Sequence, residues 1–376
     1  MRQEILGLLR CPVSGLPLVL EARETSDGHV MEGTLRTTDR RFEYPILEGV
    51  PVLLPSPATG RRTRSVFNLQ WSRRFAGLEP PHVLYGFSLD AGTEFIEQSV
   101  LRPEIRKDRW VLDAGCGTAE RSAALARRGH RVVAFDLSDS VRTAFKRFRD
   151  IPDLHLLQAD VLNPPVAPDT MDSVICVGVL HHTPDARRGF HALAGLQRPG
   201  GSLLIWVYPA DRGSTDPFLG KLYLVRDHLS VTGKLPPTLI WGLSKVTTAL
   251  LYPFFAGKFR RQRNDREVRR RDLWGAILMN TYDFLSPPYQ SRHSPEEVAR
   301  WYQDEGYGLP EKAGTGFYFS RKMLPPSARP PVSIPRSSEG TSGFDAQRRR
   351  AKARKDAECP QHPFPRVSVG TRETPT

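Results

Sequence analysis

The segment spanning residues 109–136 constrains the fold of this 376-residue chain more than any other part of its sequence. An apolar strand at 110–112 ends at Asp113, a glycine loop follows, and a helical stretch at 119–128 leads into a second apolar strand that ends at Asp136. Two strands joined by a helix in this way pair in parallel with a right-handed crossover. The alternation continues, with strands predicted at 154–158, 173–177 and 202–208 and helices at 139–149 and 186–196. The pattern predicts an α/β fold built on a parallel sheet.

The loop between the first two strands also indicates which ligand the fold binds. A dinucleotide-binding loop requires a glycine where the helix meets the pyrophosphate, and this chain has Glu120 there. Carboxylates at that turn would repel a pyrophosphate. Asp113 instead suits a ligand that carries an ammonium and a sulfonium, and Asp136 is placed to accept hydrogen bonds from both ribose hydroxyls. Since Gly115 and Gly117 allow close approach of the backbone to that ligand, the loop favours a ribose-bearing sulfonium compound over NAD.

Residues 109–209 and 284–323 resemble class I S-adenosylmethionine-dependent methyltransferases, in the branch that includes the ubiquinone-biosynthesis-like enzymes. The resemblance rests on the glycine loop and the two acids, with Ala119 in place of the family's third loop glycine. It implies an enzyme with a Rossmann-like, doubly wound, mostly parallel seven-stranded sheet. The rest of this chain adds a small N-terminal β unit and a helical insertion. The cofactor that it implies is S-adenosyl-L-methionine.

The resemblance also assigns roles to individual residues of the cofactor site. In that family the first acid lies near the methionine part of the cofactor, the loop glycines contact the cofactor, and the second acid holds the ribose. An acid after the third strand contacts the adenine amino group, and by match this is Asp160. The implied cofactor-binding residues are Asp113, Gly115, Gly117, Thr118, Asp136, Leu137, Asp160 and Val161.

Two adjacent histidines follow the fourth predicted strand, in the loop 178–185. The first and fourth strands should flank the point where the strand order reverses, which places this loop beside the reactive methyl group. A neutral imidazole there could take the proton of an acceptor hydroxyl, and His182 is the first candidate and His181 the second. One of the two should pack or bond the backbone, because neighbouring side chains in an extended loop point apart. Alternatively, placement alone could drive the transfer.

Several aromatic residues indicate what accepts the methyl group. The predicted acceptor-binding residues are Phe67, Trp71, Tyr282, Tyr289 and His293. Together with the apolar insertion they favour O- or C-methylation of a small molecule, apolar or lipid-like in character. A ribosomal or transfer RNA methyltransferase is the alternative, and a non-catalytic cofactor-binding protein is a third. The Asn/Ser-Pro-Pro motifs at 163–165 and 286–289 do not follow the fourth strand, which counts against methylation of base amino groups.

The rest of the chain divides into units around the methyltransferase domain at 101–209 and 284–324. Residues 1–57 are similar to a zinc-ribbon-like unit, but Ser14 stands where a partner of Cys11 would be, and His29 is the only other candidate ligand there. The unit therefore lacks the set of four ligands that a structural zinc site needs, and no metal site is predicted. Residues 58–100 form a helical linker or lid, in which the helix predicted at 61–75 aligns aromatic side chains on one face.

The insertion at 210–283 is expected to be helical and to cap the acceptor. Residues 238–257 are mostly apolar and 258–272 are strongly basic, so 238–271 could rest on an anionic membrane instead of spanning it. The tail 325–376 is basic and is expected to be disordered. A net charge of +13 is compatible with nucleic acid as a partner, although the motifs oppose it. Four scattered cysteines fit a cytoplasmic protein, with peripheral membrane contact as an option.

Overall fold

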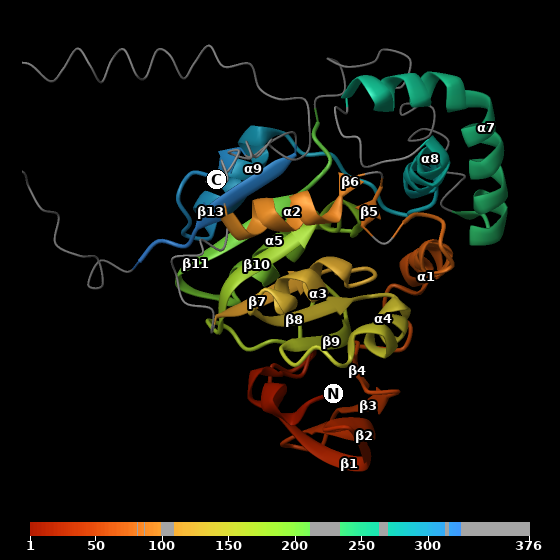
Figure 1. Ribbon diagram of the computed structural model, residues 1–376. Helices are drawn as coiled ribbons and strands as arrows, with labels where there is room; N and C mark the ends of the chain where they lie inside the picture. Colours follow the sequence, from red (N-terminus) through yellow and green to blue (C-terminus); the bar gives the residue numbers. More distant parts are fainter. Residues whose placement is uncertain are drawn as a thin grey trace, which may run out of the picture.

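The computed structural model describes residues 1–80, 82–85, 87–98, 109–210, 234–262, 270–312 and 316–324. Its centre is an eleven-stranded mixed sheet in the order β1-β2-β3-β4-β9-β8-β7-β10-β11-β13-β12 (Figure 1). The strands of this sheet are β1 (Leu18–Ser26), β2 (His29–Thr37), β3 (Glu43–Leu47), β4 (Val50–Leu53), β7 (Trp110–Ala114), β8 (Arg131–Asp136), β9 (Leu154–Ala159), β10 (Met171–Val177), β11 (Gln197–Trp206), β12 (Glu311–Lys312) and β13 (Phe317–Arg321). A separate hairpin pairs β5 (Val83–Leu84) with β6 (Phe87–Ser88).

The five strands predicted between 110 and 208 form the parallel centre of the sheet. β9, β8, β7, β10 and β11 pair in parallel in that order. The order reverses between β7 and β10, the first and fourth of these strands, as the sequence predicted. Since ligands of open α/β sheets bind at the carboxyl ends of the strands beside such a reversal, this point locates the site. Near the end of the fold, β12 and β13 form an antiparallel pair.

The expectation of a seven-stranded sheet with a separate N-terminal unit needs correction. The strands β1 to β4 form an antiparallel meander, and β4 then pairs in parallel with β9, so the N-terminal residues extend the central sheet. Figure 1 shows this meander below β9. Cys11 contacts the hydroxyl of Tyr44 at 3.1 Å, and the ring of His29 faces the carbonyl of Arg149 at 3.1 Å. Both candidate metal ligands therefore have other partners.

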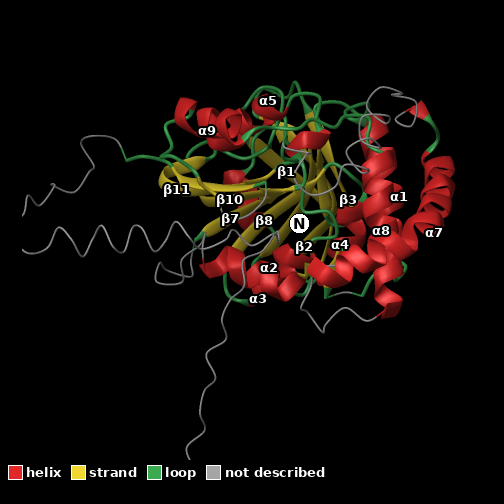
Figure 2. Ribbon diagram, turned by 90° about the horizontal axis from the view of Figure 1, so that it is seen from above, coloured by secondary structure: helices red, strands yellow, loops and turns green. Residues whose placement is uncertain are grey.

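Helices cover both faces of the sheet. Figure 2 shows α5 (Ala186–Ala194) and α9 (Pro295–Asp304) on one face, with α2 (Leu89–Ile96), α3 (Glu120–Arg127) and α4 (Ser140–Phe148) on the other. Two apolar cores result. Phe190 and Trp301 belong to the first, and Ala123 and Phe145 belong to the second. The short 3₁₀ turns are η1 (Gln3–Leu8) and η3 (Leu180–His182).

A third group of helices lies beyond one edge of these layers. It consists of α1 (Arg61–Phe75), α7 (Pro237–Gln262) and α8 (Arg270–Leu285), which pack around Val66, Trp241 and Tyr282. The predicted helix at 61–75 is thus present and lies against the described helices of the insertion (Figure 1), whose residues 211–233 and 263–269 lie outside the described residues. No helix in the described part of the chain is long and apolar enough to cross a membrane. The predicted disordered tail at 325–376 lies outside the described residues.

Candidate active site

The glycine loop between β7 and α3 is shaped by close packing. Gly115 and Gly117 have φ angles of 82° and 56°, in the left-handed region that favours glycine. A Cβ at Gly115 would lie 2.2 Å from the side chain of Val179, and one at Gly117 would lie 2.9 Å from Trp71. The absence of a Cβ at both glycines therefore also leaves room for the side chains of Val179 and Trp71 to pack against the loop. Ala119, at the position of the family's third glycine, keeps the left-handed backbone with a φ of 57°.

Asp136 lies at the carboxyl end of β8 and is held in one orientation. Its Oδ2 accepts a hydrogen bond from the backbone N–H of Gly117 at 2.9 Å. Its Oδ1 accepts from the backbone N–H of Ser138 at 2.8 Å and from the Ser138 hydroxyl at 2.5 Å. Burial raises the pKa of Asp136, although these hydrogen bonds oppose that effect. The carboxylate lines the central cavity, where its remaining lone pairs can accept from a ligand.

Two other acids at strand ends differ in what they contact. Asp160, after β9, lines the same cavity and accepts from the backbone N–H of Leu162 at 3.0 Å. Asp113 does not belong to the cavity lining in the described structure. It is buried, and its Oδ2 accepts from the hydroxyl of Ser122 on α3 at 2.6 Å. This carboxylate therefore links β7 to α3. Asp113 does not take the expected position in the cavity lining, beside the methionine part of the cofactor.

One cavity of about 700 Å³ lies over the strand reversal, within the size range of small-molecule sites. We divide its lining into two parts. The glycine-loop half comes from the chain between the end of β7 and the residues just after β9, and includes Gly115, Gly117, Thr118, Arg121, Asp136, Leu137, Asp160 and Val161. The aromatic half comes from α1, the β5 region, η3, the end of β11, α8 and the segment after it, and includes Phe67, Trp71, Tyr85, His181, His182, Tyr208, Asn280, Asp283, Tyr289 and Arg292.

The two histidines lie close together, which corrects the expectation that they point apart. The predicted extended loop is the 3₁₀ turn η3, and the ring centroids of His181 and His182 are 4.2 Å apart. Both residues line the cavity. The His182 Nδ1 donates to the carbonyl of Tyr289 at 3.2 Å, which in a neutral ring leaves the lone pair on Nε2. That Nε2 has no hydrogen bond, and it lies 3.5 Å from Oδ2 of Asp283.

Asp283, on α8, is the centre of a polar cluster that the sequence did not indicate. Its Oδ2 accepts from the Tyr208 hydroxyl at 2.8 Å, and its Oδ1 accepts from the Tyr85 hydroxyl at 3.1 Å and from Gln70 Nε2 at 3.2 Å. Burial on its own would raise the pKa of Asp283, but the charge of a protonated His182 and the hydrogen bonds to its oxygens outweigh burial and lower it. Asp283 is therefore an anion whose Oδ2 lies 3.5 Å from Nε2 of His182.

His181 has a different environment although it also lines the cavity. Its ring is fully buried and stacks on Tyr208, with the centroids 3.9 Å apart and an interplanar angle of 24°. Neither ring nitrogen has a hydrogen-bond partner. Burial, followed by nearby positive charge, lowers the pKa of His181 well below its ordinary value. The imidazole is therefore neutral and a weak base at neutral pH.

The predicted acceptor-binding residues are only partly brought together. Phe67, Trp71 and Tyr289 line the cavity, and the Phe67 ring lies 5.6 Å from that of His182. Tyr282 does not: it is fully buried between α1 and α7, packs against Trp241 and donates to the carbonyl of Val66 at 3.3 Å. His293 is also outside the lining. Its ring bonds Ser291 at 2.8 Å and Glu297 at 2.9 Å, so it supports the start of α9.

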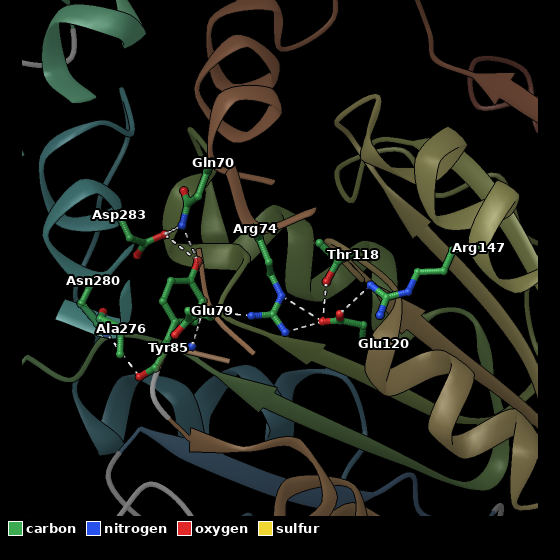
Figure 3. Close-up of polar contacts among 10 residues, drawn as sticks. All are labelled: Gln70, Arg74, Glu79, Tyr85, Thr118, Glu120, Arg147, Ala276, Asn280 and Asp283. Carbon is green, nitrogen blue, oxygen red and sulfur yellow. Dashed lines mark hydrogen bonds and ion pairs between the residues drawn. The ribbon is translucent and has the colours of Figure 1, made fainter. Parts of the chain in front are cut away.

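Helix α1 connects the two halves of the cavity (Figure 3). Arg74 donates through Nε to Glu120 at 2.9 Å and makes a second bond to the same carboxylate, which follows the glycine loop. Its Nη1 donates to Glu79 at 2.9 Å. One turn earlier, Gln70 contacts Asp283. These partners lie far apart along the chain and carry no motif, so the sequence alone does not indicate them.

The similarity of this chain to solved structures is low. The magnesium protoporphyrin IX methyltransferase of Synechocystis, solved with bound S-adenosylmethionine, is 15% identical, covers 71% of this chain and 99% of its own, and has a TM-score of 0.40.

Sequence relatives agree on one class of protein. Residues 112–205 match the family model described as a methyltransferase domain. An uncharacterized methyltransferase of Mycobacterium tuberculosis is 38% identical over 99 residues, which are 26% of this chain and 50% of the relative. A ubiquinone biosynthesis O-methyltransferase of Coxiella burnetii is 28% identical over 142 residues, 35% of this chain and 54% of the relative. The chain thus spans about half the length of these curated relatives. Residues 112–205, with the glycine loop and Asp136, therefore form a methyltransferase domain whose methyl donor is S-adenosylmethionine.

Proposed function

We propose that the protein transfers a methyl group from S-adenosylmethionine to a small-molecule acceptor, at an oxygen or a carbon atom. One observation carries the proposal: the glycine-loop half and the aromatic half line the same cavity. A donor held in the first half would face an acceptor held in the second. The aromatic half is walled by rings and by the polar cluster around Asp283, which suits an apolar molecule with a hydroxyl group.

The chemistry of the glycine-loop half fits the donor. Asp136 offers carboxylate oxygens to a ribose diol, and Asp160 offers them to an exocyclic amine. Arg121 lines the same half, and its buried Nε has no hydrogen-bond partner, so its guanidinium is suited to the carboxylate of a methionine moiety. When bound, S-adenosylmethionine supplies a methyl group that its sulfonium already activates. Leu137 and Val161 add apolar surface for the adenine.

The protein's own part in the reaction is to receive a proton from the acceptor hydroxyl. His182 lines the cavity and its buried Nε2 lies 3.5 Å from Oδ2 of Asp283, while the bond from Nδ1 to the Tyr289 carbonyl fixes the ring. A proton taken by Nε2 gives an imidazolium 3.5 Å from the Asp283 carboxylate, which stabilises the new charge. The hydroxyls of Tyr85 and Tyr208 hold Asp283 in place. His182 is thus the proposed base and Asp283 its positioning partner.

The proposal is tested with methyl-labelled S-adenosylmethionine and the full chain, against cell extract separated into lipid, small-metabolite and RNA fractions. We expect label in the lipid or small-metabolite fraction, and we expect Asp136→Ala to abolish most of it. Label confined to RNA would overturn the small-molecule assignment in favour of an RNA methyltransferase. Binding of S-adenosylhomocysteine without label in any fraction would support a non-catalytic cofactor-binding protein.

A further inference from the structure

The outward face of α7 is apolar. Leu239, Leu243, Val246 and Leu250 are exposed by 50%, 42%, 59% and 75%. Their spacing of four, three and four residues places them in one stripe along the helix. Gly242, Ala249 and Pro253 are also exposed on this helix and add no charge. A contiguous stripe of this kind is unusual on a soluble surface and marks a contact with another phase or partner.

The opposite face of α7 belongs to the protein interior. Ile240, Trp241, Ser244 and Thr248 are buried, and Trp241 packs against α8 through Tyr282. Thr247 and Leu251 lie between the two faces and line the central cavity. This one helix therefore separates the cavity from the outer surface of the protein. Its inner side closes the cavity and its outer side carries the apolar stripe. Figure 2 shows α7 at the edge of the fold.

The charges on α7 all have one sign. The helix sequence contains Lys245, Lys258, Arg260 and Arg261 and has no aspartate or glutamate. Lys245 is exposed on the same helix, to one side of the stripe. A second copy of this chain seated on the same face would bring like charges together with no acid on this helix to pair with them. An anionic surface supplies the missing partner, at about 1 kcal/mol for each basic residue near it.

We infer that α7 docks the protein on an anionic lipid bilayer. The stripe enters the boundary between headgroups and acyl chains, and Lys245 beside it meets anionic headgroups. The helix lies on the bilayer and does not cross it, in agreement with its hydropathy. Docking there places the cavity wall formed by Thr247 and Leu251 next to the lipid phase. The interaction is independent of which acceptor is methylated.

The experiment measures co-sedimentation of the full chain with vesicles of phosphatidylcholine, with and without phosphatidylglycerol. The test variant combines Leu243→Ser, Val246→Ser and Leu250→Ser, which removes apolar surface and leaves every charge in place. We expect the unchanged protein to bind the anionic vesicles far better than the neutral ones. The triple variant should bind them roughly tenfold more weakly or worse, because much of the inserted apolar area is lost.

A matched control is Leu309→Ser, which alters an equally exposed leucine, 72% accessible, outside α7. This variant should bind vesicles like the unchanged protein. Retained affinity of all variants for S-adenosylhomocysteine verifies that they are folded. Equal vesicle binding by the triple variant and the unchanged protein would overturn the inference, since basic segments elsewhere would then account for binding. Absence of vesicle binding, together with a dimer that the triple variant dissociates, would overturn it in favour of a second copy of the chain.

Discussion

The glycine-loop half and the aromatic half line one cavity, yet they are assembled in opposite ways. The first is contributed by three consecutive strand ends, and its key contacts join neighbours in sequence, such as Asp136 with Ser138. The second brings together residues from Phe67 to Arg292, and its central contact joins His182 to Asp283, 101 positions later in the sequence. A half built from local contacts can be recognised in a sequence, whereas a half built from distant contacts cannot.

The difference also concerns function. The glycine-loop half offers acids that are held in one orientation, which suit one constant ligand. The aromatic half is walled by helices α1 and α8 outside the main layers, where substitutions can change the shape of the cavity without disturbing the sheet (Figure 1). Substitutions in the two halves should therefore affect different steps, and four predictions test this separation.

The largest effect is expected from His182→Ala in the aromatic half. Because it removes the proposed base, methyl transfer should slow by roughly 100- to 10,000-fold, with little change in cofactor affinity. The loss should be greatest below the pKa of the acceptor, where the acceptor still carries its proton. Single-turnover kinetics measures the effect. His181→Ala should cost less, because its low pKa makes it a poor base; the reverse order would exchange the two roles, and normal rates in both variants would mean that placement alone suffices.

Next in size is Arg74→Met on α1, which joins the two halves. The Arg74 side chain is 2% exposed and Glu79 is fully buried, so the substitution leaves two carboxylates without their shared cation. The free energy of unfolding should fall by about 3–5 kcal/mol. Urea denaturation measures this loss. Arg147→Met breaks a more exposed ion pair to the same Glu120 and should cost less than about 1 kcal/mol, so equal losses would refute the proposed link.

Asp136→Ala should weaken the glycine-loop half. Two hydrogen bonds to the ribose would be lost, which corresponds to about 2–3 kcal/mol of binding free energy. Isothermal calorimetry with S-adenosylhomocysteine provides the measurement. Asp283→Asn should leave that affinity nearly unchanged while it slows methyl transfer. If both variants lost cofactor affinity alike, the division of the cavity into two functional halves would be wrong.

The smallest effect concerns the pH dependence of stability through His181. Its pKa is lowered on folding, so the unfolded chain binds more protons and stability falls as the pH drops below the unfolded value near 6.5. His181→Phe removes this term while it keeps an aromatic ring on Tyr208. Between about pH 7.5 and about pH 5.5 the variant should lose roughly 1 kcal/mol less stability than the unchanged protein. The lowered pKa of Asp283 acts only at more acidic pH, where its stabilising charge is lost.

The parts that the sequence determined are those with a local cause. Apolar runs and the glycines at 115 and 117 predicted the parallel strands and the loop, and the structure has them there. The acid at the end of β8 was likewise predicted to face the ligand, and it lines the cavity. In each case a residue acts on neighbours within a few positions, so its spacing is visible in the chain.

Tertiary structure alone decided the rest. The side chains that enter the cavity depend on helix packing, which moved Tyr282 into the contact between α1 and α7 and turned Asp113 toward Ser122. The pairing of β4 with β9 merged the N-terminal strands with the main sheet. Asp283 became the partner of His182 only because α8 folds back over the carboxyl ends of the strands. A contact between residues that are far apart in the chain produces no periodic pattern in a single sequence. Each of the two residue types also occurs at many positions without such a contact.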